Sequence, residues 1–388
     1  MKNIKRKRWE EDEGELVTIR YRGVWISSDG YGTLGRNLIL NLVKNGVGVR
    51  LLPDPMIYWN RYSDRSPEEL KVLFSLISEK KDYRIVLQHL IPDGFRREPK
   101  CFNLLSTIFE NKNPLKYWAD IANTADEVWL NNDFVKSIFM NSGVLEKKIR
   151  IIPQGLDCNL YHPSSPLIDW GDDVFHFLAA STLLYRKGWN ILLHAFLKEF
   201  SSSEKVKLHI FTKPTFPCDF HYILNYFRKY DFMIKKLNKP KYEVIYDYVP
   251  TFLMGRFFCS FDAFVLASRS EGWGSHYQEA MACGLPTIGT NWGGNLTFMN
   301  ENNSYLIKVD REEPVRFFEN YNKWNNERMR WAKPSEKSLR EHLRYVFDNP
   351  NEAKKMGERA SEEMKKWSWD LIIPLYVKRL KEIEESLI

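Results

Sequence analysis

Cysteine is scarce in this chain and follows no pairing pattern: five cysteines occur among 388 residues, and none stands in a C-x-x-C pair. An odd number of widely spaced cysteines argues against a disulfide framework and against a zinc site, and it fits a reducing cytoplasm. The sequence also lacks an apolar run of the ~18 residues that span a bilayer, and its start lacks the apolar core of a signal peptide. We therefore expect a cytoplasmic protein without a transmembrane segment.

Charge of one sign is not in large excess, because 57 basic and 50 acidic residues leave a net charge of +7. Such a surplus suits anionic ligands or membrane surfaces, and no motif indicates nucleic-acid binding. The start, MKNIKRKRWEEDEGE, places a basic cluster directly before an acidic one. We interpret it as a solvated tail whose charges largely cancel. A peripheral contact of the basic arm with acidic lipid at the inner membrane face stays open, as does the oligomeric state.

Length and patterning predict two α/β domains. A hydrophobic content of 44% with 13 tryptophans indicates a folded protein, and 388 residues exceed what one core usually serves. Strand-like runs alternate with helical patterns in both halves, and the Ser-, Pro- and Asp-containing residues 163–173 look like a linker between them. We predict two Rossmann-like domains with doubly wound parallel sheets, over residues 1–165 and 166–371. After Glu312 we expect helices alone, and the last of them, over 372–388, is assigned to the first domain.

The chemistry is concentrated in residues 264–290, FVLASRSEGWGSHYQEAMACGLPTIGT. Two short apolar runs of strand type flank a glycine-containing loop and a helix, which makes a βαβ unit. Ser275 and Gln278 have the spacing of a capping box, so the helix is expected to begin near His276. The loop and the first helical turn should then lie at the carboxyl edge of a parallel sheet, where α/β proteins bind ligands.

Two carboxylates, Glu271 and Glu279, lie eight residues apart in this unit. Free amides of Gly274, Ser275 and His276 at the helix start favour an anion such as phosphate. A carboxylate beside phosphate would repel it, but its oxygens suit the hydroxyls of a ribose or a sugar ring. A phosphate between two polyols describes a nucleotide sugar. Taken singly, each acid has a plainer explanation, as a solvated loop residue or as a partner of the helix dipole.

The run EGWGSHYQEAMACGLP resembles the E-x7-E signature of retaining glycosyltransferases of family 4, which have the two-domain GT-B fold with a cleft between the domains. The resemblance covers nearly the whole chain from about residue 23. It implies that Glu271 contacts the donor sugar and Glu279 the nucleotide ribose, with Gly272 and Trp273 in the same donor-binding loop. It also implies hexosyl or related transfer to a hydroxyl of a carbohydrate, lipid-linked or small-molecule acceptor. No cofactor besides the nucleotide-diphosphate sugar is expected, and a C-terminal helix should cross back to the first domain.

A basic loop precedes the helix of YRKGWNILLHAF and supplies Arg186 and Lys187. Two permanent positive charges at the same sheet edge would neutralise a diphosphate, although exposed basic residues at a helix start are common. The segment resembles the basic loop of family 4, where many members carry an Arg at the position of Thr182, so that role is transferred to Arg186. By the same resemblance, Tyr248 and Val249 are expected at the nucleobase.

A rival interpretation starts from GYGTLG at residues 30–35, a match to the dinucleotide fingerprint G-x-G-x-x-G, with Asp54 as a ribose-binding acid. It would make the protein a nicotinamide- or flavin-dependent oxidoreductase. Here we expect a strand ending at 24–27, a turn at 29–32 and a helix from about Thr33. The glycines are equally explained by a tight turn and close helix packing. In family 4 this turn faces the donor phosphates or acceptor, a role that maps to Gly32.

Two further residues of the first half are candidates by their place at predicted strand ends. His89 follows the strand at 84–88, and family members often carry a His there that faces the donor sugar. Glu110 either faces the cleft or is a satisfied surface carboxylate. Since no Asp-x-Asp motif occurs in the sequence, we expect transfer without a metal ion. A noncatalytic carbohydrate-binding protein of the same fold is the remaining alternative.

Overall fold

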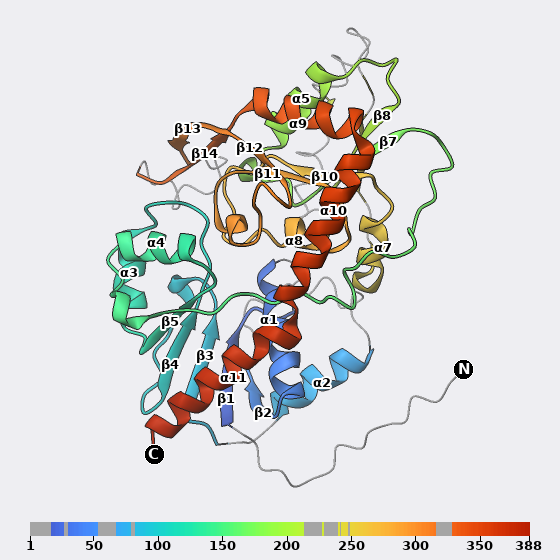
Figure 1. The fold of residues 1–388 in the computed structure, drawn as a ribbon. Coiled ribbons are helices and arrows are strands. Elements are labelled where there is room, and N and C mark those ends of the chain that lie inside the picture. The colour runs from blue at the N-terminus through green and yellow to red at the C-terminus, as the bar shows by residue number, and fades with distance from the viewer. Residues whose placement is uncertain are drawn as a thin grey trace, which may run out of the picture.

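The computed structural model describes residues 17–26, 30–52, 67–78, 82–212, 227–228, 240, 242–246, 249–315 and 328–388. They form two α/β domains, shown one above the other in Figure 1, each built around a six-stranded sheet. The predicted α/β class with two parallel sheets is confirmed. The two sheets lie on either side of the predicted linker.

The first sheet has the strand order β2-β1-β3-β4-β5-β6, and all its strand pairs are parallel. Strands β3 and β5 are buried along their whole length, as expected for central parallel strands, whereas β1 alternates between buried and half-buried residues. The order changes direction at β1, which places the carboxyl ends of β1 and β3 at a topological switch point. The elements are β1 (Val17–Gly23), α1 (Gly30–Lys44), β2 (Val47–Leu51), α2 (Pro67–Ser78), β3 (Ile85–His89), β4 (Phe102–Ser106), α3 (Lys116–Ala122), β5 (Glu127–Leu130), α4 (Asp133–Asn141) and β6 (Ile149–Ile151).

The second sheet has the order β12-β11-β10-β7-β8-β9, again with parallel pairs throughout. Its elements are β7 (Phe175–Ala180), α5 (Trp189–Glu199), β8 (Val206–Phe211), β9 (Tyr242–Ile245), α7 (Met254–Phe258), β10 (Ala263–Leu266), α8 (Ser275–Ala282), β11 (Thr287–Thr290), β12 (Tyr305–Ile307), α9 (Glu336–Asp348) and α10 (Pro350–Met364).

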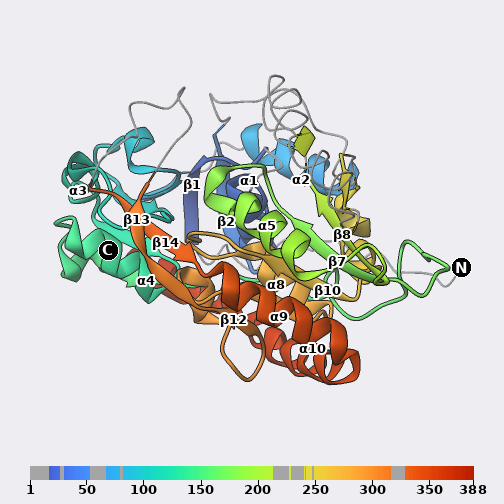
Figure 2. The ribbon, with the colours of Figure 1, turned by 90° about the horizontal axis from the view of Figure 1, so that it is seen from above.

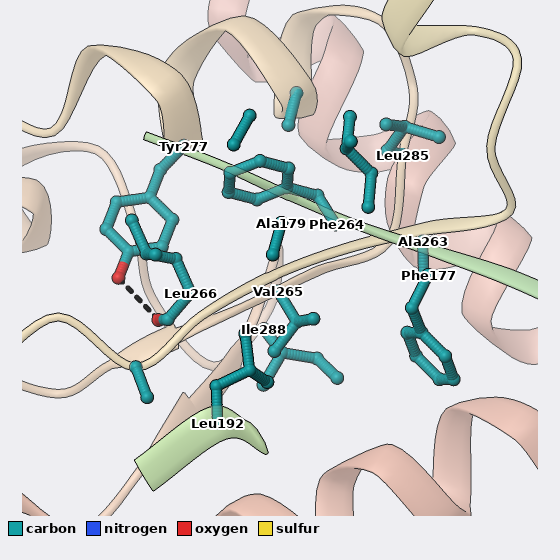
Figure 3. Close-up of a cluster of buried hydrophobic side chains, with 14 of the residues drawn as sticks. Phe177, Ala179, Leu192, Ala263, Phe264, Val265, Leu266, Tyr277, Leu285 and Ile288 are labelled. Atoms are coloured by element: carbon teal, nitrogen blue, oxygen red, sulfur yellow. Dashed lines mark hydrogen bonds between the residues drawn. The ribbon is translucent and has the colours of Figure 1, made fainter. Parts of the chain in front are cut away.

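Strand β10 is the centre of the second core. Figure 3 shows Phe264 on the same side of the strands as Tyr277 of α8, while Val265 lies on the side of Leu192 of α5. The Tyr277 hydroxyl donates a hydrogen bond of 2.6 Å to the carbonyl of Leu266, which satisfies a polar group in an apolar setting. A fully buried β10 therefore fixes the position of the loop that follows it.

The last helix, α11 (Trp369–Ser386), leaves the second domain and runs across the first, as predicted (Figure 1). It buries one face in the hydrophobic cluster of β1, α1 and β2, where each large apolar side chain contributes about 1.5–3 kcal/mol. The residues of that face are Trp369, Ile372, Ile373, Tyr376, Leu380 and Ile383. Among the described residues, none of the helices is both long and apolar enough to cross a membrane.

The start of α1 differs from the prediction. Strand β1 ends at Gly23, and α1 begins at Gly30, so the GYGTLG run forms the first turns of the helix rather than a turn before it. A Cβ on Gly35 would lie 2.2 Å from the carbonyl oxygen of Val24, so close packing of the helix explains the third glycine. Residues 27–29 and Asp54 lie outside the described residues. The fingerprint therefore lies within the helix and is separated from the end of β1 by six residues, 24–29.

A hairpin replaces part of the expected helical region. Strands β13 (Val309–Pro314) and β14 (Arg330–Pro334) pair antiparallel, so the prediction of helices only beyond Glu312 is wrong. The backbone of Arg330 also forms an antiparallel bridge with Lys112 of the first domain, and Trp331 is buried in a cluster with Trp118. Figure 2 shows the hairpin beside this part of the first domain. The hairpin joins the two domains.

Candidate functional site

The loop after β10, residues 267–274, is here called the signature loop. It brings three of the predicted residues together. Glu271 is only 5% exposed, and its carboxylate lies 2.7 Å from Lys187 Nζ and 2.9 Å from Arg186 Nη1. It also accepts a hydrogen bond of 2.7 Å from the Ser268 hydroxyl. The acid expected at the donor sugar and the cations expected at the diphosphate thus form one buried cluster.

The electrostatics of this cluster keep it ionised. Burial by itself would raise the pKa of Glu271, but Lys187 and Arg186 outweigh it and lower that pKa to about 2. Burial lowers the pKa of Lys187, against the attraction of Glu271. For Arg186 burial acts in the same direction, but Glu110 and Glu271 together raise its pKa. The site therefore holds preformed charges of both signs.

The basic loop is fixed against the signature loop by its backbone. The amide of Arg269 donates to the carbonyl of Arg186 at 2.7 Å. Gly188, the residue before α5, has a φ of +70°, and a Cβ there would lie 1.8 Å from the carbonyl oxygen of Ala267. Because β7 and β10 are neighbours in a parallel sheet, their following loops meet at the same edge.

Helix α8 begins at Ser275, and its N-cap is Gly274 with a φ of +92°. The predicted capping box is wrong: the Ser275 hydroxyl accepts a hydrogen bond from Gln154 of the first domain at 2.8 Å, and the Gln278 side chain accepts from Trp273. The positive end of α8 therefore has no side-chain cap in the described structure, and its role in binding an anion stays a prediction.

The second acid, Glu279, has partners of its own. Its carboxylate lies 2.9 Å from Nδ1 of His276, one helical turn before it. Tyr161, from the segment between the domains, lies against it, and burial followed by Glu279 raises the pKa of the Tyr161 hydroxyl. Glu279 is thus placed on the first turns of α8, where a polyol could exchange with His276 as its hydrogen-bonding partner.

The other donor-binding candidates lie in different surroundings. Trp273 is 3% exposed and packs its ring against Phe298 and Trp367, so its side chain is part of the core. Gly272 packs against Ile108 and Phe109 of the first domain. Val249 follows β9 and is half-buried, and Tyr248 lies outside the described residues. The role of the last two at a nucleobase stays a prediction.

His89 ends β3 and is fully buried. Its Nδ1 lies 3.1 Å from the Ser106 hydroxyl, and Nε2 has no hydrogen-bond partner within the described part of the chain. The ring of Tyr31 lies 5.2 Å away, next to Gly32 in the first turn of α1. Because His89 is fully buried, contact with a donor sugar would require a neighbouring group to move, and the catalytic role of His89 stays a prediction.

Acid sensitivity should reveal the buried state of His89. Burial lowers its pKa to about 4 from 6.5, so between these values the unfolded chain binds a proton that the folded chain does not. Stability is unaffected above pH 6.5 and falls as the pH drops toward 4, by about 2 kcal/mol at pH 5. The free energy of unfolding of wild type, measured in urea at pH 7 and pH 5, should therefore fall by about 2 kcal/mol more than that of His89→Gln. Equal losses in both proteins would contradict the prediction.

The first domain also meets the signature loop through residues that the sequence indicated weakly or not at all. Glu110 does face the junction, with its carboxylate 3.1 Å from Arg186 Nη2 and its backbone carbonyl accepting from the Ser270 hydroxyl. A Cβ on Gly272 would lie 2.3 Å from Ile108, whose backbone is bonded to the Tyr31 hydroxyl. Asn131 and Asn132 both donate hydrogen bonds to the backbone carbonyl of Gly272. The sequence did not predict these contacts, because a buried amide that bonds one backbone carbonyl leaves no pattern in a sequence.

Residues 168–330 match the family model of glycosyl transferases group 1, and the matched part contains Glu271, Glu279, Arg186 and Lys187. No curated protein matches the sequence significantly. Within the described residues, no group of three or more His, Cys, Asp and Glu side chains is arranged to hold a metal ion.

Solved structures of similar fold cover almost the whole chain. HepE of Anabaena in complex with UDP and glucose has a TM-score of 0.64 at 12% identity, over 94% of this chain and 100% of that one. Sucrose-phosphate synthase from Thermosynechococcus elongatus has a TM-score of 0.67 at 14% identity, over 95% and 100%. A glycosyltransferase from Rickettsia africae has a TM-score of 0.66 at 18% identity, over 95% and 98%. The predicted GT-B architecture is confirmed, and the family match supports a glycosyltransferase.

Proposed function

We propose that the protein is a retaining glycosyltransferase of family 4 that moves a hexosyl or related sugar from a nucleotide-diphosphate sugar to a hydroxyl of a carbohydrate or lipid-linked acceptor, without a metal ion. The observation that carries the proposal is the buried cluster of Glu271, Lys187 and Arg186 beside the uncapped start of α8. The family match over this segment supports it, as do the complexes of HepE with UDP and with UDP-glucose.

The chemistry follows from where charge develops. Departure of a nucleoside diphosphate leaves negative charge on its oxygens, which Arg186, Lys187 and the amides at the start of α8 would stabilise. In the structure both cations are paired with carboxylates. Donor binding would therefore turn them from Glu271 toward the diphosphate and free that carboxylate to accept hydroxyls of the donor sugar, while Glu279 takes those of the ribose.

Retention of configuration needs no protein nucleophile if the acceptor attacks from the side that the diphosphate leaves. The departing phosphate oxygen would then take the proton of the acceptor hydroxyl, while Glu271 supports the positive charge that develops on the donor sugar. Two permanent cations would take the place of a metal ion at the diphosphate.

Ligand-dependent thermal unfolding tests the donor class. A nucleoside diphosphate present at 100 times its Kd should stabilise the protein by about 2.7 kcal/mol, whereas reduced nicotinamide dinucleotide should leave the melting temperature unchanged. UDP, GDP and ADP are compared, with UDP tested first because HepE binds it. Lys187→Ala should lose the shift. Lys198→Ala, which removes a surface pair with Glu336, should keep it.

Two results would contradict the proposal. A shift with the dinucleotide alone would revive the oxidoreductase interpretation. A shift with a nucleoside diphosphate, but no hydrolysis or transfer with any nucleotide sugar, would indicate a noncatalytic binding protein of the same fold.

A further inference from the structure

Asn132 connects the two domains through a single side chain. It lies between β5 and α4 of the first domain and is 2% exposed. Its Oδ1 accepts a hydrogen bond of 2.8 Å from the amide of Val135 and so caps α4. Its Nδ2 donates a hydrogen bond of 2.6 Å to the carbonyl of Gly272, in the signature loop of the second domain, and Asn131 reaches the same carbonyl at 3.3 Å. The amide oxygen thus caps the helix of its own domain. The amide nitrogen bonds the opposite domain and also donates to Oδ1 of the neighbouring Asn131 at 3.2 Å.

The second domain leaves room for this contact at Gly294. A Cβ there would lie 2.0 Å from the carbonyl oxygen of Gly272 and 2.6 Å from Nδ2 of Asn132. The amide of Gly294 in turn donates a hydrogen bond of 2.7 Å to the carbonyl of Glu271. The backbone of Glu271 and Gly272 is therefore held by the first domain through Asn132 and by its own domain through Gly294.

We propose that Asn132 is a positioning residue, which fixes the Gly272 carbonyl when the domains are together and thereby places Glu271 for the donor sugar. The proposal rests on the proposed function. Without Asn132 the buried Gly272 carbonyl keeps, among the described residues, only the longer contact of 3.3 Å with Asn131. The loss of its shorter hydrogen bond is costly, so the signature loop changes its arrangement when Asn132 is withdrawn. Through Asn132 the first domain contributes to the order of the donor site, although this side chain does not touch the donor.

Asn132→Asp separates the two roles of the side chain. Aspartate keeps an oxygen to cap α4, but it presents an oxygen in place of Nδ2 to the Gly272 carbonyl. We expect kcat for transfer to fall at least tenfold, while KM for the nucleotide sugar changes less than threefold. Asn132→Ser also caps the helix but is too short to reach Gly272, and it should give the same split without a new charge.

Asn123→Asp is the matched control. Asn123 donates to the carbonyl of Gly143 at 2.9 Å and accepts from the amide of Leu145 at 3.0 Å, all within the first domain. The same chemical change there should leave kcat within twofold of wild type. Gly294→Ala should reproduce the loss in kcat. The double variant Asn132→Asp/Gly294→Ala should be no slower than the slower single variant, because both break one arrangement; multiplied losses would overturn the proposal.

Hydrogen exchange gives a readout that does not depend on turnover. The amide of Gly294, bonded to the Glu271 carbonyl, should exchange at least tenfold faster in Asn132→Asp and Asn132→Ser than in wild type or Asn123→Asp. Faster exchange in a protein that transfers no sugar would reject the proposed function but retain the link between Asn132 and the loop. Active Asn132 variants with wild-type kcat and exchange would overturn the positioning role alone.

Discussion

Replacing Glu271 by glutamine is expected to lower kcat/KM for the nucleotide sugar at least a hundredfold, or about 2.7 kcal/mol of barrier. Glutamine keeps the shape but brings an NH2 group into a site that already contains the donors Lys187, Arg186 and Ser268. The two cations would face a neutral amide, and the donor sugar would lose a charged acceptor for its hydroxyls. Initial rates at varied donor concentration measure the effect.

Glu313→Gln is the control for this variant. Glu313 lies 3.0 Å from Arg269 of the same loop, so the substitution removes an ion pair of the same kind outside the cluster. Its kcat/KM should stay within threefold of wild type. Comparable losses in the two variants would mean that any disturbance of the loop reduces activity, and the role assigned to Glu271 would be wrong.

The stabilities of wild type and Glu271→Gln should depend differently on pH. Because Lys187 and Arg186 hold the pKa of Glu271 at about 2, below its ordinary 4.5, the carboxylate stabilises the fold at pH values above 4.5. That contribution is lost as the pH falls from 4.5 toward 2. The stability difference between wild type and Glu271→Gln should therefore shrink over this range.

Gly188→Ala is expected to destabilise the protein by more than about 3 kcal/mol, whereas Gly171→Ala should cost only about 1 kcal/mol. Both glycines have left-handed backbones, with φ of +70° and +63°. A Cβ at Gly188 would lie 1.8 Å from the carbonyl oxygen of Ala267, while nothing lies within 4 Å of one at Gly171. The comparison therefore separates the clash from the cost of the backbone conformation.

Urea unfolding of the two alanine variants measures this difference. Gly188 directly follows Lys187 in the chain, so a clash there would displace this cation. Gly188→Ala should therefore also lose nucleoside diphosphate binding. Failure of Gly188→Ala to fold, with Gly171→Ala folded, agrees with the expectation. Equal losses of about 1 kcal/mol in both would show that the loop after β10 moves aside at little cost.

The sequence predicted most of what regular patterning determines. The spacing within residues 264–290 was enough to locate β10, α8 and β11. The proximity of Glu271 to Arg186 and Lys187 could be predicted because the loops after neighbouring parallel strands lie at the same edge of the sheet. The capping box failed because tertiary contacts decided otherwise: Gly274 takes the cap, and Ser275 bonds Gln154 across the domains.

Other features depend on contacts that no local pattern encodes. The hairpin of β13 and β14 is short and charged along β13, and it is stabilised by the first domain rather than by its own propensity. His89 could be located at a strand end, but its cover by Tyr31 depends on where α1 begins. The amide of Asn132 acquires its partner only when the two halves meet.

The attachment of the hairpin limits how the halves can move. One hydrophobic cluster contains residues of both domains. The second domain contributes Val315, Met329 and Trp331, and the first contributes Phe109 and Trp118. Spreading the sheets apart would pull these side chains into water, whereas a rotation about them keeps them covered. Opening of the molecule on the side of β14 is therefore opposed by the exposure of this apolar cluster.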